Sequence, residues 1–309
     1  MDSIIGREEE RKNLLRLYGE NKSEFVLVMG RKRVGKTFLI NQTFQDRIVF
    51  RHIGLSPLAL GKVSSKKKLQ RQLIAFQVSL INPGFEDAPL PEDWMHAFLL
   101  LEKFLDRVDK DKRLLIFLDE LTWLDTEGSL FITALEFFWN SWACHQDRVM
   151  LIGAGSATSW MENALIHNKG GLYGRITYQI HLNPFTLHEC EEYYHYRRIE
   201  MSRYDATLCY MVLGGIPYYL NYLDASLSLP QNIDRILFAD NAPLQGEFDL
   251  LFSSIFTNAG RMKDIISVLI EKSIGLTRME LTKKLHIYLH GRAVPVRKQF
   301  LKMTSSMLF

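Results

Sequence analysis

The chain has 309 residues, of which 47% are hydrophobic and 24% are charged, with a formal net charge of +3. This composition is ordinary for a globular protein, and the net charge is too small to argue for nucleic-acid binding by itself. The three cysteines form no C-x-x-C pair, which argues against a zinc site or a disulfide framework. The N-terminus has no signal-peptide core, and no apolar run approaches the roughly 20 residues that span a bilayer, so we expect a soluble cytoplasmic protein without a membrane partner.

Strands and helices are predicted to alternate along the first 182 residues. Apolar runs typical of buried strands lie at 25–29, 47–53, 113–120 and 148–156, and helical patterns lie at 7–19, 37–44, 64–81, 94–109, 129–143 and 157–167. This alternation indicates a parallel sheet with helices on both faces. We therefore predict an α/β core over residues 1–182.

The first strand runs into GRKRVGKT at residues 30–37, which has the spacing G-x-x-x-x-G-K-T of a phosphate-binding loop. Gly30 and Gly35 let backbone N–H groups point inward, and the helix that follows adds its positive N-terminal dipole. Lys36 can reach the terminal phosphates, and Thr37 supplies a hydroxyl for Mg²⁺. We assign the whole loop and the residue after it to nucleotide binding: Gly30, Arg31, Lys32, Arg33, Val34, Gly35, Lys36, Thr37 and Phe38.

Three cations, Arg31, Lys32 and Arg33, fill the variable positions of this loop. We expect their side chains to be solvated on the exterior of the loop. The alternative is that they attract the nucleotide or lie against another subunit.

The strand at 113–120 ends in the acidic pair Asp119-Glu120. The carboxyl end of a parallel strand lies at the same sheet edge as the phosphate loop, so we expect the pair to lie beside that loop. Asp119 is predicted to hold Mg²⁺, and Glu120 to orient and deprotonate an attacking water. A water-activating glutamate favours an NTPase over a small-molecule kinase.

Two further polar residues are candidates for the same site. Ser156 ends the strand at 148–156, where its hydroxyl would touch the γ-phosphate or the attacking water; alternatively it caps the next helix. Arg175, in the glycine-rich segment GGLYGR, would neutralise charge on the transferring phosphoryl group, in cis or across a subunit interface. The alternative for Arg175 is a surface arginine paired with an acid.

Helical patterns dominate after LNPF (182–185), at 186–199, 203–213, 217–224, 231–239 and 246–258. We place a domain boundary near residue 183 and predict an all-α lid over 183–258. In the last segment, 259–309, RMKDIISVLIEK is helical, and 275–285 is a second short helix capped by Thr277 with Glu280 three residues on. Two short helices joined by a glycine turn are the opening of a helix-turn-helix.

These motifs together resemble the archaeal-type ATPase family, a branch of the AAA+ and STAND-like P-loop NTPases common in Bacteroidetes and archaea. In chain order they are IIGREEE (4–10), GRKRVGKT (30–37), LIFLDEL (115–121), GSATSWM (155–161), NKGGLYGR (168–175), LNPFTLHECEEY (182–193) and GGIPYYL (214–220). Few other families combine the opening GRE box, PF-x-L after the arginine and GG-x-P in the helical domain.

The resemblance implies that ATP and Mg²⁺ are the ligands. In the GRE box, Ile5, Gly6 and Arg7 would lie against the adenine, and Pro217 of GGIP would pack on the nucleotide from the other side. The resemblance assigns ATP·Mg²⁺ binding and hydrolysis to Lys36, Thr37, Asp119 and Glu120, and the sensor or arginine-finger role to Arg175. The alternatives stay open that Ile5 and Gly6 only cap the first helix and that Pro217 only breaks one.

The chain departs from the family pattern after residue 285. Relatives continue into a complete winged helix, and many carry a further domain that resembles restriction endonucleases, whereas 286–309 has no clear helical or strand period. We therefore expect a partial winged-helix segment and a natural gene that is truncated or frameshifted near residue 286. Resequencing of the locus tests this expectation.

These residues are compatible with three functions. The leading hypothesis is an ATPase in which binding and slow hydrolysis change the angle between core and lid. The second is a nucleotide-gated regulatory module with little turnover, acting on a homo-oligomer or an unidentified protein partner. The third is a DNA-associated regulator that uses residues 260–285 and the basic helix start at 66–71, although a lysine run is more commonly a solvated helix face.

Overall fold

The computed structural model of the chain describes residues 4–156, 158–167, 170–247, 259–270 and 275–284. The chain divides into two compact units, Met1–Ala239 and Asp240–Phe309. The domain boundary expected near residue 183 falls inside the first unit and stays a prediction. The helix expected at 246–258 lies almost entirely outside the described residues.

The first unit is built on a five-stranded parallel sheet with the strand order β2-β3-β4-β1-β5. The strands are β1 (Glu24–Met29), β2 (Ile48–Ile53), β3 (Leu114–Asp119), β4 (Val149–Gly155) and β5 (Tyr178–His181). The four predicted strands and the parallel sheet are therefore confirmed. The sequence did not predict β5, which pairs with the edge of β1 that β4 leaves open.

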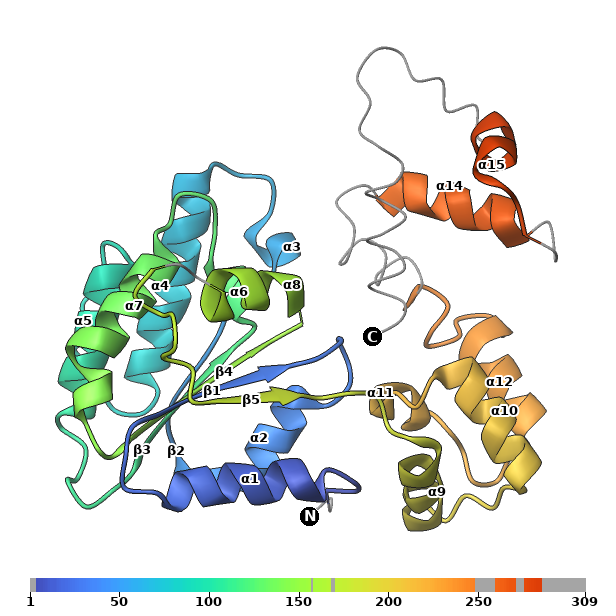
Figure 1. Cartoon of the computed structure of the whole chain (residues 1–309), viewed down its shortest axis with the longest axis horizontal. Coiled ribbons are helices and arrows are strands. Elements are labelled where there is room, and N and C mark those ends of the chain that lie inside the picture. The colour runs from blue at the N-terminus through green and yellow to red at the C-terminus, as the bar shows by residue number, and fades with distance from the viewer. Residues whose placement is uncertain (1–3, 157, 168–169, 248–258, 271–274, 285–309) are drawn as a thin grey trace. The chain divides into compact units, whose positions relative to one another are not determined.

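Helices cover both faces of this sheet (Figure 1). In the core they are α1 (Glu8–Gly19), α2 (Lys36–Phe44), α3 (Pro57–Leu60), α4 (Ser65–Ile81), α5 (Trp94–Leu105), α6 (Leu121–Leu124), α7 (Phe131–Ser141) and α8 (Thr158–Met161), with the short turns η1 (Gln45–Arg47), η2 (Ala143–His145) and η3 (Glu162–Ile166). Alternate residues of β1 face opposite ways, because Val26 and Val28 pack with α1 and α2 while Leu27 packs with α4, α5 and α7.

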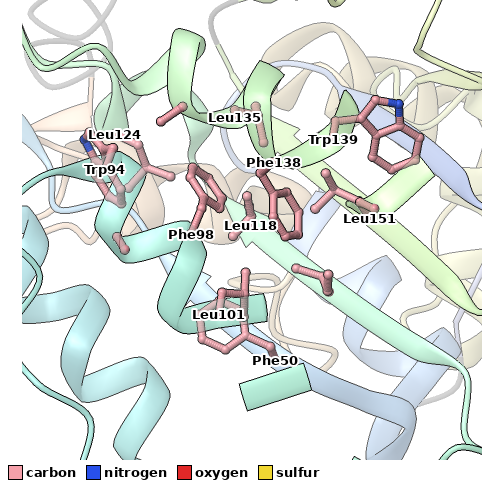
Figure 2. Close-up of a cluster of buried hydrophobic side chains, with 14 of the residues drawn as sticks. Phe50, Trp94, Phe98, Leu101, Leu118, Leu124, Leu135, Phe138, Trp139 and Leu151 are labelled. Atoms are coloured by element: carbon pink, nitrogen blue, oxygen red, sulfur yellow. The ribbon is translucent and has the colours of Figure 1, made fainter. Parts of the chain in front are cut away.

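Aromatic side chains fill the space between the sheet, α5 and α7 (Figure 2). Phe98 of α5 stacks on Phe138 of α7 with ring centroids 5.0 Å apart. Trp94 meets Phe131 edge to face, also at 5.0 Å. Burial of each such ring contributes about 2 kcal/mol. This packing supports β3, which ends at Asp119, the first residue of the acidic pair.

A helical segment follows β5. It contains α9 (Leu187–Tyr196), α10 (Arg203–Leu213), α11 (Pro217–Leu220), α12 (Leu229–Ile233) and the turn η4 (Asp234–Phe238). Thr186 and Glu189 cap α9 reciprocally: the Glu189 amide donates to Thr186 Oγ1 at 3.2 Å, and the Thr186 amide donates to Glu189 Oε2 at 2.7 Å. Gly214, in the left-handed region with φ 65°, ends α10.

In the second unit the described residues form α14 (Ala259–Ile270) and α15 (Arg278–Lys284). The predicted cap of α15 is confirmed, because the Thr277 amide donates to Glu280 Oε2 at 2.8 Å and the Glu280 amide donates to Thr277 Oγ1 at 3.3 Å. The winged-helix assignment stays a prediction, since residues 285–309 lie outside the described part of the chain. Within the described residues, no helix has the length and apolar character needed to cross a membrane.

Candidate functional site

The loop after β1 is held closely against β5. A Cβ added at Gly30 would lie 2.3 Å from the carbonyl oxygen of Leu182, so only glycine fits there. The Leu182 amide donates to Met29 O at 2.7 Å and fixes this approach. Gly35 has φ 96°, a conformation that glycine adopts without strain, and α2 begins at the next residue. Leu182, the residue directly after the unpredicted strand β5, therefore confines the loop at Gly30.

Lys36 and Thr37 both point back toward the loop and the acidic pair. Lys36 Nζ donates to the carbonyl oxygens of Gly30 at 2.8 Å and Arg31 at 3.1 Å. Burial lowers the pKa of Lys36, and the carboxylates of Glu120 and Asp119 act in the opposite direction. Thr37 Oγ1 donates to Asp119 Oδ2 at 2.6 Å. The loop and the acidic pair therefore meet, as the sequence predicts.

Glu120 is held in a left-handed backbone conformation, with φ 51° and ψ 51°. Its amide donates to Asp119 Oδ1 at 3.0 Å, and its carboxylate accepts a hydrogen bond from Ser156 Oγ at 3.3 Å. Burial raises the pKa of Glu120, while the ammonium of Lys36 opposes that shift. Ser156 thus lies beside the acidic pair at the end of β4; its contact with a γ-phosphate stays a prediction.

The three variable cations of the loop differ in environment. Arg31 is exposed, as expected, whereas Lys32 Nζ lies 5.2 Å from the ring centroid of Trp123. The guanidinium of Arg33 lies over the ring of Tyr218, 4.4 Å from its centroid. The expectation of a solvated side chain is therefore wrong for Arg33. The reason is that α11 lies beside the loop and covers this position with aromatic side chains.

Val34 and Phe38, two further residues assigned to nucleotide binding, lie in different environments. Val34 is buried among the side chains of α1 and α2. Phe38, on the first turn of α2, keeps 44% of its surface exposed. Val34 therefore anchors the loop to the core, while Phe38 is accessible to a ligand or partner. Contact of either residue with a nucleotide stays a prediction.

The GRE box contacts the start of the helical segment directly. Arg7, in the left-handed region with φ 65°, donates to the carbonyl oxygen of Asn183 and stacks over Phe185 at 4.9 Å. Its Nη1 lies 4.0 Å from Glu189 Oε1. Burial lowers the pKa of Arg7. A Cβ on Gly6 would lie 2.7 Å from Glu189 Oε1. These contacts give the box a structural role, and its contact with adenine stays a prediction.

An open hollow of about 480 Å³ borders the GRE box. Its lining residues are Ile4, Gly6, Glu8, Arg11, Lys12 and Leu15. Ile5 is half-buried next to it, and Pro217, also half-buried, begins α11. Pro217 thus occupies the first helical position, which suits proline, while also adjoining the tyrosine that covers Arg33.

Arg175 lies in an exposed turn that α7 holds in place. Its amide donates to Leu172 O at 3.0 Å, and Asn140 of α7 donates to Gly171 O at 2.9 Å. Among the described residues, the side chain of Arg175 takes part in none of the ion pairs. The sensor or finger role of Arg175 stays a prediction.

Sequence reasoning missed three residues that surround the acidic pair: Gly54, Gln72 and Trp123. Of these three, Gln72 is the residue whose role the sequence pattern could have indicated. It lies on the apolar face of α4 together with the buried residues Leu73, Phe76 and Leu80. A polar residue on an apolar helix face is rarely placed there without a hydrogen-bonding role.

A family model described as an ATPase domain predominantly from Archaea matches residues 4–223. The chain belongs to this ATPase family. The match spans the GRE box, the phosphate loop, the acidic pair and α11, so the resemblance inferred from the motifs is confirmed.

Two curated relatives come from Methanocaldococcus jannaschii. An uncharacterized protein is 26% identical over 270 residues, which cover 86% of this chain and 54% of that protein. An uncharacterized ATP-binding protein is 38% identical over 48 residues, which cover 16% of this chain and 81% of that protein. The chain therefore spans about half the length of the first relative.

Two solved structures share the fold. The Walker-type ATPase of Pyrococcus abyssi superposes with a TM-score of 0.62 at 16% identity, covering 98% of this chain and 89% of that chain. The ORC2 protein of Aeropyrum pernix, solved with ADPNP and ADP, gives a TM-score of 0.52 at 13% identity, covering 99% of this chain and 86% of that chain. At these identities the likeness establishes the fold alone.

Proposed function

We propose that this chain binds ATP with Mg²⁺ and hydrolyses it slowly at the carboxyl edge of the sheet. The observation that carries the proposal is the 2.6 Å hydrogen bond from Thr37 Oγ1 to Asp119 Oδ2, which joins the phosphate loop to the acidic pair. Membership of an ATPase family supports the same ligand. Neither the loop nor the pair alone would distinguish phosphate binding from hydrolysis.

The donor set at this edge fits a magnesium ion. The hydroxyl of Thr37 and the buried carboxylate of Asp119 are hard oxygen ligands, which Mg²⁺ prefers, and they adjoin the loop that would hold the phosphates. When bound, the ion would neutralise charge on the β- and γ-phosphates. Thr37 and Asp119 are therefore the residues that we propose as its protein ligands.

Glu120 is proposed as the base that deprotonates the attacking water. Its carboxylate lies beside the loop lysine, and burial raises its pKa toward the operating pH, which improves a general base. Ser156 donates to one carboxylate oxygen and fixes its orientation, leaving Glu120 Oε1 for a water. Lys36, which lies against loop carbonyls in the structure, is proposed to transfer its hydrogen bonds to the phosphates of ATP.

The test is phosphate release from Mg·ATP by the purified chain and by Glu120→Gln. The amide keeps the size of the carboxylate but cannot accept the proton, so turnover should fall by roughly 100-fold or more while ATP affinity is retained. Lys36→Ala, which removes the phosphate-binding charge, should instead weaken ATP binding itself. Equal turnover by Glu120→Gln and the wild type would rule Glu120 out as the base.

A second function, nucleotide gating of the helical segment, is favoured by the contact of Arg33 with Tyr218. Arg33 belongs to the phosphate loop and Tyr218 to α11. A change in loop conformation on ATP binding would therefore alter the position of α11 through this contact. The expected signature is ATP-dependent protection of the α11 amides from hydrogen exchange, reduced in Arg33→Ala. This signature requires binding but no turnover, which separates gating from hydrolysis.

Arg175 is proposed as the finger that reaches the γ-phosphate, either of its own site or of a neighbouring copy. Its exposure and its fixed turn support both possibilities. Mixing Arg175→Ala with Lys36→Ala tests the second possibility: recovery of turnover in the mixture requires an oligomer in which Arg175 of one copy completes the site of another. DNA association through 260–285 remains the prediction made from the sequence.

We keep the cytoplasm as the proposed location. All three cysteines, Cys144, Cys190 and Cys209, are free thiols in the structure. Free thiols suit a reducing compartment.

A further inference from the structure

The backbone at Glu120 requires support from its surroundings. A φ of 51° with a ψ of 51° places a residue that carries a Cβ in the left-handed region, where the Cβ crowds the backbone. Such a conformation persists only when neighbouring groups over-determine it, and it is found preferentially at functional sites. The direction in which the Glu120 carboxylate leaves the chain depends on this conformation.

Two segments hold the Glu120 peptide directly. On one side, the amide of Trp123 in α6 donates to the Glu120 carbonyl at 2.8 Å. On the other side, Gly54 follows β2, and its amide donates to Asp119 O at 3.1 Å. A Cβ on Gly54 would lie 2.9 Å from the same Glu120 carbonyl oxygen, so the two segments enclose it.

Gln72 of α4 joins these two segments. Its Nε2 donates to Trp123 O at 2.6 Å and to Leu55 O at 3.0 Å, and its Oε1 accepts from the Leu55 amide at 3.0 Å. The side chain is completely buried, so both of its N–H donors are used within the protein. Leu55 directly follows Gly54, so the amide of Gln72 bridges the residues that flank the Glu120 carbonyl on both sides.

Trp123 also connects the hydrogen bonds of Gln72 to the phosphate loop. The ammonium of Lys32 lies over the indole of Trp123, 5.2 Å from the ring centroid. Trp123 therefore contacts Gln72 through its carbonyl, Glu120 through its amide and the phosphate loop through its indole ring. A shift of α6 would alter the placement of Glu120 relative to the loop.

We propose that Gln72 is a positioning residue for Glu120: its three hydrogen bonds lock Leu55 and Trp123 around the Glu120 peptide and so aim the carboxylate at the phosphate loop. The proposal rests on the function proposed above for Glu120. It predicts that Gln72 affects the chemical step and leaves nucleotide binding unchanged, because the three hydrogen bonds of Gln72 go to Leu55 and Trp123 and not to the residues proposed to hold ATP and Mg²⁺.

The variants are Gln72→Leu, Gln72→Glu and the matched control Gln77→Leu. Gln77 lies on the same helix and donates through Nε2 to Ala88 O at 2.8 Å, away from Glu120. We expect both Gln72 variants to lower kcat by roughly 100-fold, since a misplacement of about 1 Å can cost that much, while the Kd for ATP changes less than about threefold. Gln77→Leu should keep the wild-type kcat. An equal loss of kcat in Gln77→Leu, or a parallel loss of ATP affinity in the Gln72 variants, overturns the proposal.

Gln72→Glu adds a signature that a merely structural role would not produce. An ionised glutamate can accept from Leu55 but cannot donate to Trp123 O, whereas a protonated one can donate. Burial raises the pKa of such a carboxyl group. The ratio of kcat in Gln72→Glu to kcat in the wild type should therefore rise as the pH falls from about 8.5 to about 6. A ratio independent of pH overturns the proposal.

Crystal structures separate this proposal from the hydrolytic function itself. In Gln72→Leu, or in Gln72→Glu if the leucine variant does not fold, Glu120 should leave the left-handed region that the wild type adopts. Glu120 retained near φ 51° in the variant overturns the proposal, whatever the turnover. Absence of turnover in the wild type would instead overturn the hydrolytic function, and the structural comparison would still decide the role of Gln72.

Discussion

The His52 imidazole should make the stability of the core depend on pH. His52 lies on β2 with only 2% of its surface exposed, and its ring meets Phe76 edge to face at 4.9 Å. Ser79 Oγ donates to Ala75 O at 3.1 Å, so it accepts from His52 Nδ1, 2.9 Å away. Nδ1 therefore carries a proton. Burial lowers the pKa of His52 from 6.5 to about 3.

The direction of this pH dependence follows from whether the folded or the unfolded chain binds the proton more readily. Below pH 6.5 the unfolded chain protonates His52, whereas the folded chain resists protonation until the pH approaches about 3. The stability linked to His52 is thus fully present above pH 6.5 and is lost as the pH falls toward 3. At pH 5, which is 1.5 units below the unfolded value, the loss amounts to about 2 kcal/mol.

Urea unfolding followed by tryptophan fluorescence measures this loss. All five tryptophans lie between residues 94 and 160, so the signal reports on the core. The control is His52→Gln, whose amide can still donate to Ser79 but has no proton to gain. Between pH 7.5 and pH 5, the free energy of unfolding should fall by about 2 kcal/mol more in the wild type than in the variant. Parallel pH profiles for the two proteins would refute the reasoning.

Two further predictions concern the loop. Gly30→Ala places a Cβ 2.3 Å from the carbonyl oxygen of Leu182, so the loop or β5 must shift and the Kd for ATP should rise by roughly tenfold or more, whereas Gly19→Ala, which meets nothing within 4 Å, should bind ATP like the wild type. Equal ATP affinities of Gly30→Ala and the wild type in calorimetric titrations would contradict the claim that Leu182 confines the loop. A double-mutant cycle of Arg33→Ala and Tyr218→Ala in urea unfolding should give a coupling free energy of about 0.5–2 kcal/mol, and a value near zero would show that the stacking contributes nothing.

The sheet was largely predictable because its central strands are apolar on both faces. All six residues of β1 and of β3 are buried, and such runs stand out in a sequence. β5 was not predictable in the same way. It is an edge strand of four residues in which only Ile180 is buried, so the sequence offers neither an apolar run nor a long alternation. Its place beside β1 is set by tertiary pairing.

The site was predictable where one local motif carries the chemistry. The spacing of the phosphate loop and the acidic end of β3 sufficed to bring Thr37 and Asp119 together. The partners of Arg33 and of Glu120 were not predictable, because they come from distant parts of the chain. No spacing near Arg33 indicates that Tyr218 will cover it, and no pattern near Glu120 indicates the left-handed backbone or its tie to Gln72.

The central claim is tested most directly by a crystal structure of the chain with Mg²⁺ and a non-hydrolysable ATP analogue. The account predicts that the phosphates lie in the loop at 30–37, that Lys36 leaves the carbonyls of Gly30 and Arg31 to contact them, and that Thr37 and Asp119 both serve the metal ion. An analogue bound elsewhere, or a loop that keeps Lys36 on its own carbonyls in the presence of saturating analogue, would contradict the account.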